Sequence, residues 1–291
     1  MLTSIELTGF RGFRQLKLEG LQRVNLIVGK NNSGKTSLLE AIERFGKRSG
    51  KDKSKLRVVD NDDENLLWQI HDQHRSTGAK ITINGGHSQY TVSVQDGNVR
   101  HTNHGDRVAI VTLPIQPKSP SELSQTLSSA IRIQGAEDLL VKSLNEIDPR
   151  ISKIRTVPDK DGIILDIGLA ELVPVSLVGQ GVYRLLDIYS EIIGSKAKVC
   201  LIDEIENGIH HSSLIDLWKG IADAAERFDV QIFATTHSYE CIEAAHEAFC
   251  ERSTYGLSVI QLYRKTISVQ GDILDKEHIA AAMDGKIDLR G

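Results

Sequence analysis

The chain has only three cysteines among its 291 residues. Cys200, Cys241 and Cys250 contain no C-x-x-C pair, which a zinc ribbon or a thioredoxin-type redox site would need. A sparse and odd number of cysteines also argues against a disulfide framework and for a reducing compartment. The chain does not open with a basic segment followed by an apolar block. We therefore expect no secretory signal and a cytoplasmic protein.

The sequence also lacks long apolar runs and a strong charge of one sign. No apolar run approaches the roughly 18 residues of a membrane helix, which predicts no membrane partner. The net charge of −4 provides no global basic field for nucleic acid. A local basic run over residues 47–55 is open to two interpretations, a nucleic-acid contact or a solvated loop, and the loop is favoured.

Histidine, a common metal ligand, recurs at short spacing in two places. Two H-x-x-H pairs are present, His71 with His74 and His101 with His104. No cysteine or carboxylate stands near them at a recognisable ligand spacing. We interpret both pairs as surface histidines rather than metal sites.

The strongest motif that is present covers residues 29–36, GKNNSGKT, and fits the phosphate-binding pattern G-x-x-x-x-G-K-[ST]. An apolar, β-branched run over 24–28 predicts a buried strand before it, and residues 37–45 have helical spacing after it. Glycines let the backbone approach phosphates, and the N–H groups at a helix start favour negative charge. The loop therefore predicts ATP binding, through Gly29, Lys30, Asn31, Asn32, Ser33, Gly34, Lys35, Thr36 and Ser37. Lys35 is expected at the β- and γ-phosphates, and the Thr36 hydroxyl on Mg²⁺.

Two more buried strands end in residues that suit catalysis. The apolar run over 199–202 ends at Asp203 and Glu204. Active sites of open α/β sheets lie at the carboxyl ends of such strands. Asp203 is predicted to hold Mg²⁺, and Glu204 to polarise the attacking water. The run over 230–236 ends at His237, which we expect to hydrogen-bond the γ-phosphate or that water.

The remaining patterns predict the surroundings of these motifs. Alternation over residues 5–18 indicates an antiparallel pair of strands, and runs over 79–83, 90–94 and 108–113 indicate a small antiparallel sheet beside the nucleotide. Helix-start chemistry at Ser119 and Pro120 opens a predicted helical segment over 119–148. Two strands are expected near 151–157 and 162–167, and a helix over 182–193. A helix over 239–249 and a strand over 257–263 follow, with a short strand and helix at the end.

A pair of glycines, Gly179 and Gly181, stands before the helix over 182–193 and is weak evidence alone. In chain order, however, the phosphate loop, this pair, Asp203–Glu204 and His237 resemble the Walker A, signature, Walker B and switch histidine of ABC-type ATPases. Within that class the chain looks like the SMC/RecF/OLD branch. Residues 7–13 (LTGFRGF) resemble its "NFRxF" strand, and residues 203–210 (DEIENGIH) its "DEPExxLH" segment. Residues 176–186 (SLVGQGVYRLL) resemble the "SSxGDGxxRLL" signature of bacterial AAA15-like ATPases.

The resemblance implies a fold and further site residues. The fold would be a P-loop NTPase of the α/β class, an ABC-ATPase-like mainly parallel sheet with helices, an antiparallel β lead-in and a small helical subdomain. We expect one ATPase domain over 1–291, with 119–148 and 173–195 forming the helical, signature-bearing part. The usual LSGGQ spacing is absent. The additional nucleotide-binding residues implied are Arg11, Gln116, Ser176, Gly179, Gln180 and Gly181, with Gln116 also near the metal.

The resemblance also implies a mechanism and partners. Two subunits, or a higher even oligomer, would sandwich ATP and Mg²⁺ head to tail, and hydrolysis would release them. Such a switch would control a separate effector, a TOPRIM-type nuclease, in DNA metabolism or phage defence, and nucleic acid remains a possible partner. The alternative is an ATP-binding scaffold or sensor with little hydrolysis. A transporter ATPase subunit is disfavoured by residues 7–13 and by the signature.

Overall fold

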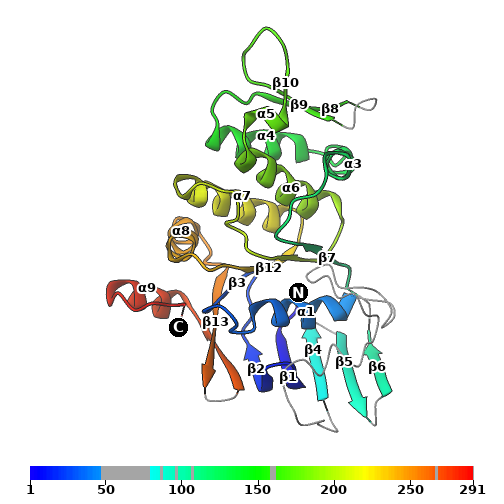
Figure 1. The fold of residues 1–291 in the computed structure, drawn as a ribbon, viewed down its shortest axis with the longest axis vertical. Coiled ribbons are helices and arrows are strands. Elements are labelled where there is room, and N and C mark those ends of the chain that lie inside the picture. The colour runs from blue at the N-terminus through cyan, green and yellow to red at the C-terminus, as the bar shows by residue number, and fades with distance from the viewer. Residues whose placement is uncertain are drawn as a thin grey trace.

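A six-stranded, mainly parallel sheet runs through the middle of the computed structural model (Figure 1). Strands β13 (Leu257–Lys265), β3 (Val24–Val28), β12 (Gln231–Thr235), β11 (Val199–Ile202) and β7 (Ile110–Leu113) lie side by side in this order and pair in parallel. Strand β14 (Ser268–Leu274) pairs antiparallel with β13 at the edge. Every residue of the central strands β3, β11 and β12 is buried, because both faces of the sheet are covered.

The structure describes residues 1–46, 79–85, 88–95, 98–105, 108–157, 162–265 and 268–290. The basic run over 47–55 and the pair His71 and His74 lie outside these ranges. Their predicted roles stay predictions.

Successive residues of the central strands point into two separate cores. Leu26 and Val28 belong to the core on one face, and Ile27 to the core on the other. Helices α6 (Gln180–Gly194), α7 (Leu214–Arg227) and α8 (Tyr239–Cys250) lie on the first face, which is the upper side in Figure 1. Helices α3 (Pro120–Ala130) and α4 (Ala136–Ile147) pack on α6 and α7 from outside. Helix α1 (Lys35–Gly46) packs on the second face.

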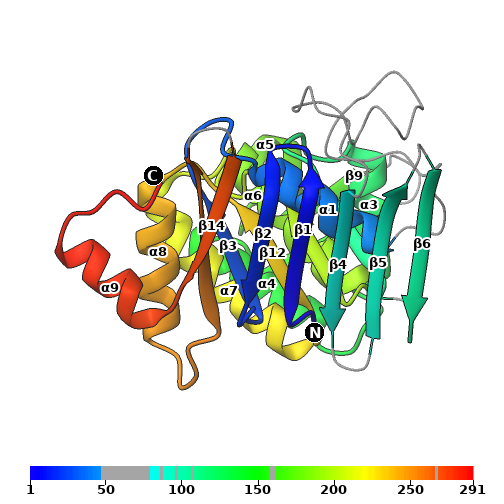
Figure 2. The ribbon, with the colours of Figure 1, turned by 90° about the horizontal axis from the view of Figure 1, so that it is seen from below.

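A five-stranded antiparallel sheet covers the other side of α1. Its spatial order is β2 (Phe13–Glu19), β1 (Ser4–Phe10), β4 (Ala79–Gly85), β5 (Ser88–Gln95) and β6 (Asn98–His104). Strand β14 runs beside β2 (Figure 2), and the Val269 N–H donates to the Gly12 carbonyl over 2.9 Å. The β13–β14 hairpin therefore joins the two sheets.

Smaller elements complete the helical side. Strands β8 (Lys153–Val157), β9 (Gly162–Asp166) and β10 (Val173–Pro174) form a three-stranded antiparallel sheet at its outer end. The short helix α5 (Val175–Val178) and the 3₁₀ turn η2 (His211–Ser213) precede α6 and α7, and α9 (Lys276–Asp284) packs beside α8. Helix α3 begins with a capping box formed by Ser119 and Glu122, as its sequence predicts.

Most predicted elements are confirmed, with one error of placement. The run over 108–113 does form a strand, β7, but it pairs in parallel with β11 in the central sheet and not in the antiparallel one. Its Val/Ile-rich composition suits either sheet, and only the long-range pairing decides between them. Strand β6, which carries His101 and His104, was not predicted because its sequence is polar. The predicted helical segment over 119–148 is confirmed and consists of two helices, α3 and α4.

Candidate active site

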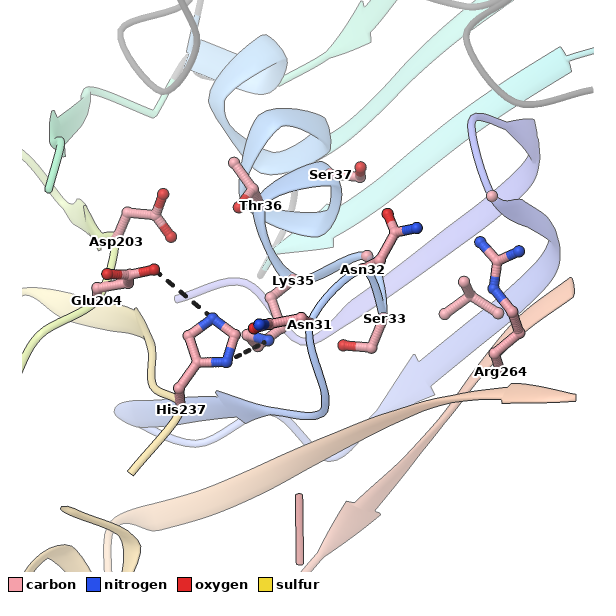
Figure 3. Close-up of a pocket in the computed structure, with 13 residues that line it drawn as sticks. Asn31, Asn32, Ser33, Lys35, Thr36, Ser37, Asp203, Glu204, His237 and Arg264 are labelled. Carbon is pink, nitrogen blue, oxygen red and sulfur yellow. Dashed lines mark hydrogen bonds and ion pairs between the residues drawn. The ribbon is translucent and has the colours of Figure 1, made fainter. Parts of the chain in front are cut away.

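The phosphate loop and the ends of β11 and β12 meet in one pocket of about 220 Å³ (Figure 3). The pocket therefore brings together the predicted Walker A, Walker B and switch residues. Its lining consists of Gly12, Asn31, Asn32, Ser33, Gly34, Lys35, Thr36, Ser37, Asp203, Glu204, His237, Arg264 and Val269.

Two glycines fix the path of the phosphate loop. Gly29 has φ +149°, and a Cβ atom there would lie 2.4 Å from the Leu262 carbonyl oxygen. Gly34 has φ +95°, and its Cβ would lie 3.0 Å from the Phe13 ring. Both positions combine a backbone that favours glycine with a close approach, so a side chain would displace the loop. Helix α1 begins directly after it, at Lys35, with its first N–H groups at the pocket.

The Lys35 side chain folds back across the loop. Its Nζ donates to the carbonyl oxygens of Gly29 and Lys30, at 2.6 and 3.0 Å, and lies 3.2 Å from His237 Nδ1. Burial lowers the pKa of Lys35 to about 8, although Asp203 and Glu204 act in the opposite direction. A negative charge bound in the pocket would therefore stabilise the charged form of Lys35.

Thr235, at the end of β12, positions both acidic residues. Its hydroxyl donates to Asp203 Oδ1 over 2.6 Å and accepts the Glu204 N–H over 2.8 Å. Glu204 has φ +47°, a conformation that is uncommon for a residue with a side chain and that clusters at functional sites. Thr235 was not singled out from the sequence, since a buried threonine in a strand has no distinguishing pattern.

His237 stands between the phosphate loop and the acidic strand end. Its Nε2 lies 3.6 Å from Glu204 Oε1, and its backbone N–H donates to Glu206 Oε1 over 2.8 Å. Figure 3 shows the imidazole ring between Lys35 and Glu204. Three segments that are far apart in the sequence therefore converge on one chain of polar contacts.

The signature residues lie elsewhere. Gly179, with φ +133°, precedes α6, and Ser176 lies in α5. With Gln180 they line a second cavity of about 430 Å³, which also includes Pro117, Asn207 and Gly208. Gly181 lines a third cavity, of about 410 Å³, that adjoins Gly179. None of the four predicted signature residues, all within the described ranges, is part of the phosphate-loop pocket of the same chain.

A buried arginine connects the signature helix to the acidic strand end. Arg184, in α6, is 1% exposed. Its guanidinium donates to the carbonyl oxygens of Pro114 and Asp203, at 3.2 and 3.4 Å, and pairs with Asp187. Helix α6 is thereby held against the carboxyl ends of β7 and β11.

Apart from the signature residues, four predicted nucleotide-binding residues do not line the pocket: Gly29, Lys30, Arg11 and Gln116. Gly29 and Lys30 belong to the loop itself, and their carbonyl oxygens accept from Lys35 Nζ. Arg11 is buried and pairs with Glu40 of α1 over 2.8 Å, behind the loop. Gln116 is exposed on the segment after β7. Gly12, from the stretch over 7–13, lines the pocket. Arg264 and Val269 line it too although no sequence pattern marked them, because their position depends on the pairing of β14 beside β2.

The described residues give no support for a metal site at the second H-x-x-H pair, His101 and His104. His101 Nδ1 lies 2.6 Å from the Tyr90 hydroxyl on the adjacent strand. Within the described ranges, no group of three or more histidine, cysteine or acidic side chains could hold a metal ion by itself. No helix in the same ranges has the length and apolar character needed to cross a membrane.

Comparisons with known proteins agree with this geometry. The model of the AAA ATPase domain family matches residues 1–163, and a second AAA domain model matches residues 95–243. The chain belongs to the AAA ATPase domain family. It is an ATPase with a P-loop NTPase fold of the α/β class.

Its relatives differ in how much of the chain they share. An "ATP/GTP phosphatase" of Helicobacter pylori is 23% identical, over 87% of this chain and 89% of its own. A "DNA replication and repair protein RecF" of Shewanella frigidimarina is 33% identical, but only over 42% of this chain and 34% of its own. The SMC head domain from Thermotoga maritima superimposes with a TM-score of 0.61 at 14% identity, over 94% of this chain and 99% of its own. An SMC head crystallised with the C-winged helix domain of ScpA gives 0.66 at 14% identity, over 97% and 99%.

Proposed function

We propose that this ATPase is a dimeric switch, closed by ATP and opened by hydrolysis, that controls a separate effector protein. The observation that carries the proposal is the separation of the signature residues from the phosphate-loop pocket. Gly179 and Gly181 open onto their own cavities, so a second copy of the chain is needed to bring them to a nucleotide. We take residues 1–291 to act as one ATPase unit in this dimer.

The pocket suits a nucleoside triphosphate. Lys35 and the N–H groups at the start of α1 would hold the phosphates, with Ser33, Thr36 and Ser37 beside them. The low pKa of Lys35 supports this assignment, because a lysine buried at this cost is stabilised by a phosphate anion.

The donor set at one side of the pocket fits Mg²⁺. Thr36 and Asp203 are hard oxygen ligands, and Mg²⁺ is usually held by one or two carboxylates together with substrate phosphates. Thr235 orients Asp203 from outside the ligand set. The ion would neutralise charge on the transferred phosphoryl group. Gln116, which is exposed after β7, would join this set only after a rearrangement.

Hydrolysis would depend on Glu204 and His237. The carboxylate of Glu204 faces the pocket and would accept the proton of the attacking water. His237 would orient that carboxylate and hydrogen-bond the γ-phosphate. Lys35 would neutralise the charge that develops on the phosphoryl oxygens.

The test is the molecular mass in solution of wild type and Glu204→Gln, each with and without Mg-ATP. We expect ATP to convert the Glu204→Gln variant into a lasting dimer, whereas wild type should form a dimer only transiently. Glu137→Gln, an exposed carboxylate on α4, serves as the matched control. If the molecular mass of neither protein changes when Mg-ATP is added, the switch is contradicted and a preassembled ATP-binding scaffold is favoured.

The effector is proposed on the likeness to RecF and on the family resemblance alone. The role would be in DNA metabolism or phage defence, with a nuclease of the TOPRIM type as the separate effector, in the cytoplasm. Linear duplex DNA added to the ATPase assay tests the first part, since a DNA-dependent switch should change its turnover. An unchanged turnover at low salt would remove DNA as a direct ligand.

A further inference from the structure

One end of the pocket is built by Gly12, from the stretch over 7–13, and by two residues of β13 and β14 that the ATPase motifs do not include. Arg264 of β13 pairs in register with Val269 of β14, and the Val269 N–H bonds to the Gly12 carbonyl. A Cβ atom on Gly12 would lie 3.2 Å from Val269 Cγ2. Gly12, Val269 and Arg264 therefore form one continuous wall of the pocket.

This wall lies across the phosphate loop from the catalytic groups. In Figure 3, Asp203, Glu204 and His237 stand on one side of the loop and Arg264 on the other. The proposed function places the γ-phosphate beside Glu204, and the inference rests on that placement. The opposite end of the nucleotide, its nucleoside, must then point toward Arg264.

The chemistry of the wall suits a flat, weakly polar group. Val269 is 1% exposed and packs against Gly12, so it forms the apolar backing of the wall rather than its surface. Arg264 is exposed and forms no ion pair within the part of the chain that the structure describes. A guanidinium is planar and packs favourably on aromatic faces, whereas Lys35 already supplies the cation for the phosphates.

We propose that Arg264, backed by Val269, forms the base-binding end of the nucleotide site, with the Arg264 guanidinium packing on the face of the purine. Arg264 is thus a specificity-determining residue of the same reaction. The β13–β14 hairpin supplies it, and the hairpin follows the last ATPase motif in the sequence.

Binding of two ligands, Mg-ATP and inorganic triphosphate with Mg²⁺, separates base contact from phosphate contact. By isothermal titration, Arg264→Ala should weaken ATP binding about fivefold and leave triphosphate binding within about twofold. Arg264→Lys should recover little, because an ammonium has no planar face. Lys265→Ala, which removes the next cation of the same strand, should bind both ligands as wild type does.

Two results would overturn the inference. If Arg264→Ala weakens the binding of both ligands equally and Arg264→Lys restores it, Arg264 is a phosphate contact. Unchanged ATP binding in Arg264→Ala would remove it from the site. Lys35→Ala distinguishes these failures from a failure of the proposed function. This substitution should weaken the binding of both ligands. If it weakens the binding of neither, the nucleotide does not bind in this pocket.

Discussion

Lys35 Nζ lies 3.2 Å from His237 Nδ1, and this contact determines which way the histidine can act. An ammonium group only donates, so Nδ1 must accept, and a neutral imidazole then carries its proton on Nε2. That nitrogen faces Glu204 Oε1 at 3.6 Å. Lys35, His237 and Glu204 thus form an ordered series of donors and acceptors, with the carboxylate at its accepting end.

Glu204→Gln should abolish most hydrolysis while keeping nucleotide binding. An amide cannot take the proton of the attacking water, and general base catalysis contributes about 10²–10⁴-fold to a rate. ATP affinity should stay equal or rise, because a negative charge near the phosphates is removed. Single-turnover hydrolysis and a binding titration on the same preparation check both statements. A rate within threefold of wild type would show that another group activates the water.

His237→Gln should retain more activity than His237→Ala. The glutamine amide can supply an N–H near the position of Nε2, whereas alanine leaves Glu204 and the γ-phosphate without that donor. We expect a loss in kcat of about 10²-fold for alanine, and a smaller loss for glutamine. Steady-state turnover at saturating ATP measures the difference. Equal losses in both variants would mean that the imidazole acts through its charge or shape.

ATP affinity should fall as the pH rises above 8. The pKa of Lys35 is about 8 in the free protein because burial disfavours its charge, and bound phosphates must raise it. Below pH 8 the lysine is charged in both states, and the affinity is flat. Above pH 8 the free protein has lost the proton and must take it up on binding, which costs up to about tenfold in affinity per pH unit. Titrations from pH 7 to 9.5 measure this slope, and Lys35→Met should show none of it.

The sequence predicted the chemistry of the site better than its surroundings. Residues 29–36, Asp203, Glu204 and His237 carry local patterns that link strand ends to phosphate chemistry, and residues 31–36 line one pocket with the other three. The placement of β7, Arg11 and Arg264 depends instead on which strands become neighbours. Polar strand β6 and buried Thr235 were missed because neither has a periodicity that separates it from a loop or a core position.

Gly29→Ala should destabilise the fold more than Gly20→Ala. Both glycines have positive φ, +149° and +87°. A Cβ atom at Gly29 would also meet the Leu262 carbonyl oxygen at 2.4 Å, whereas one at Gly20 has no atom within 4 Å among the described neighbours. We expect a loss of about 2–4 kcal/mol in the free energy of unfolding for the first and about 1 kcal/mol for the second. Urea unfolding of both variants provides the comparison, and equal losses would indicate that the loop relaxes around the new methyl group.

Gly181→Ala should leave the stability of the monomer intact but prevent assembly of the ATP-bound dimer. Gly181 lies in the first turn of α6. Among the described residues outside that turn, an added Cβ would meet only the Gly208 carbonyl oxygen, at 3.5 Å. The monomer should therefore be as stable as wild type or up to about 1 kcal/mol more stable, since alanine favours a helix. In the proposed dimer the same methyl group would project at the nucleotide of the partner. Combined with Glu204→Gln, the substitution should prevent the ATP-induced increase in mass. Gly256→Ala, where the nearest atoms are 4.0 Å away, is the matched control. A dimer that still forms with Gly181→Ala would mean that the signature glycine does not face the partner's ATP.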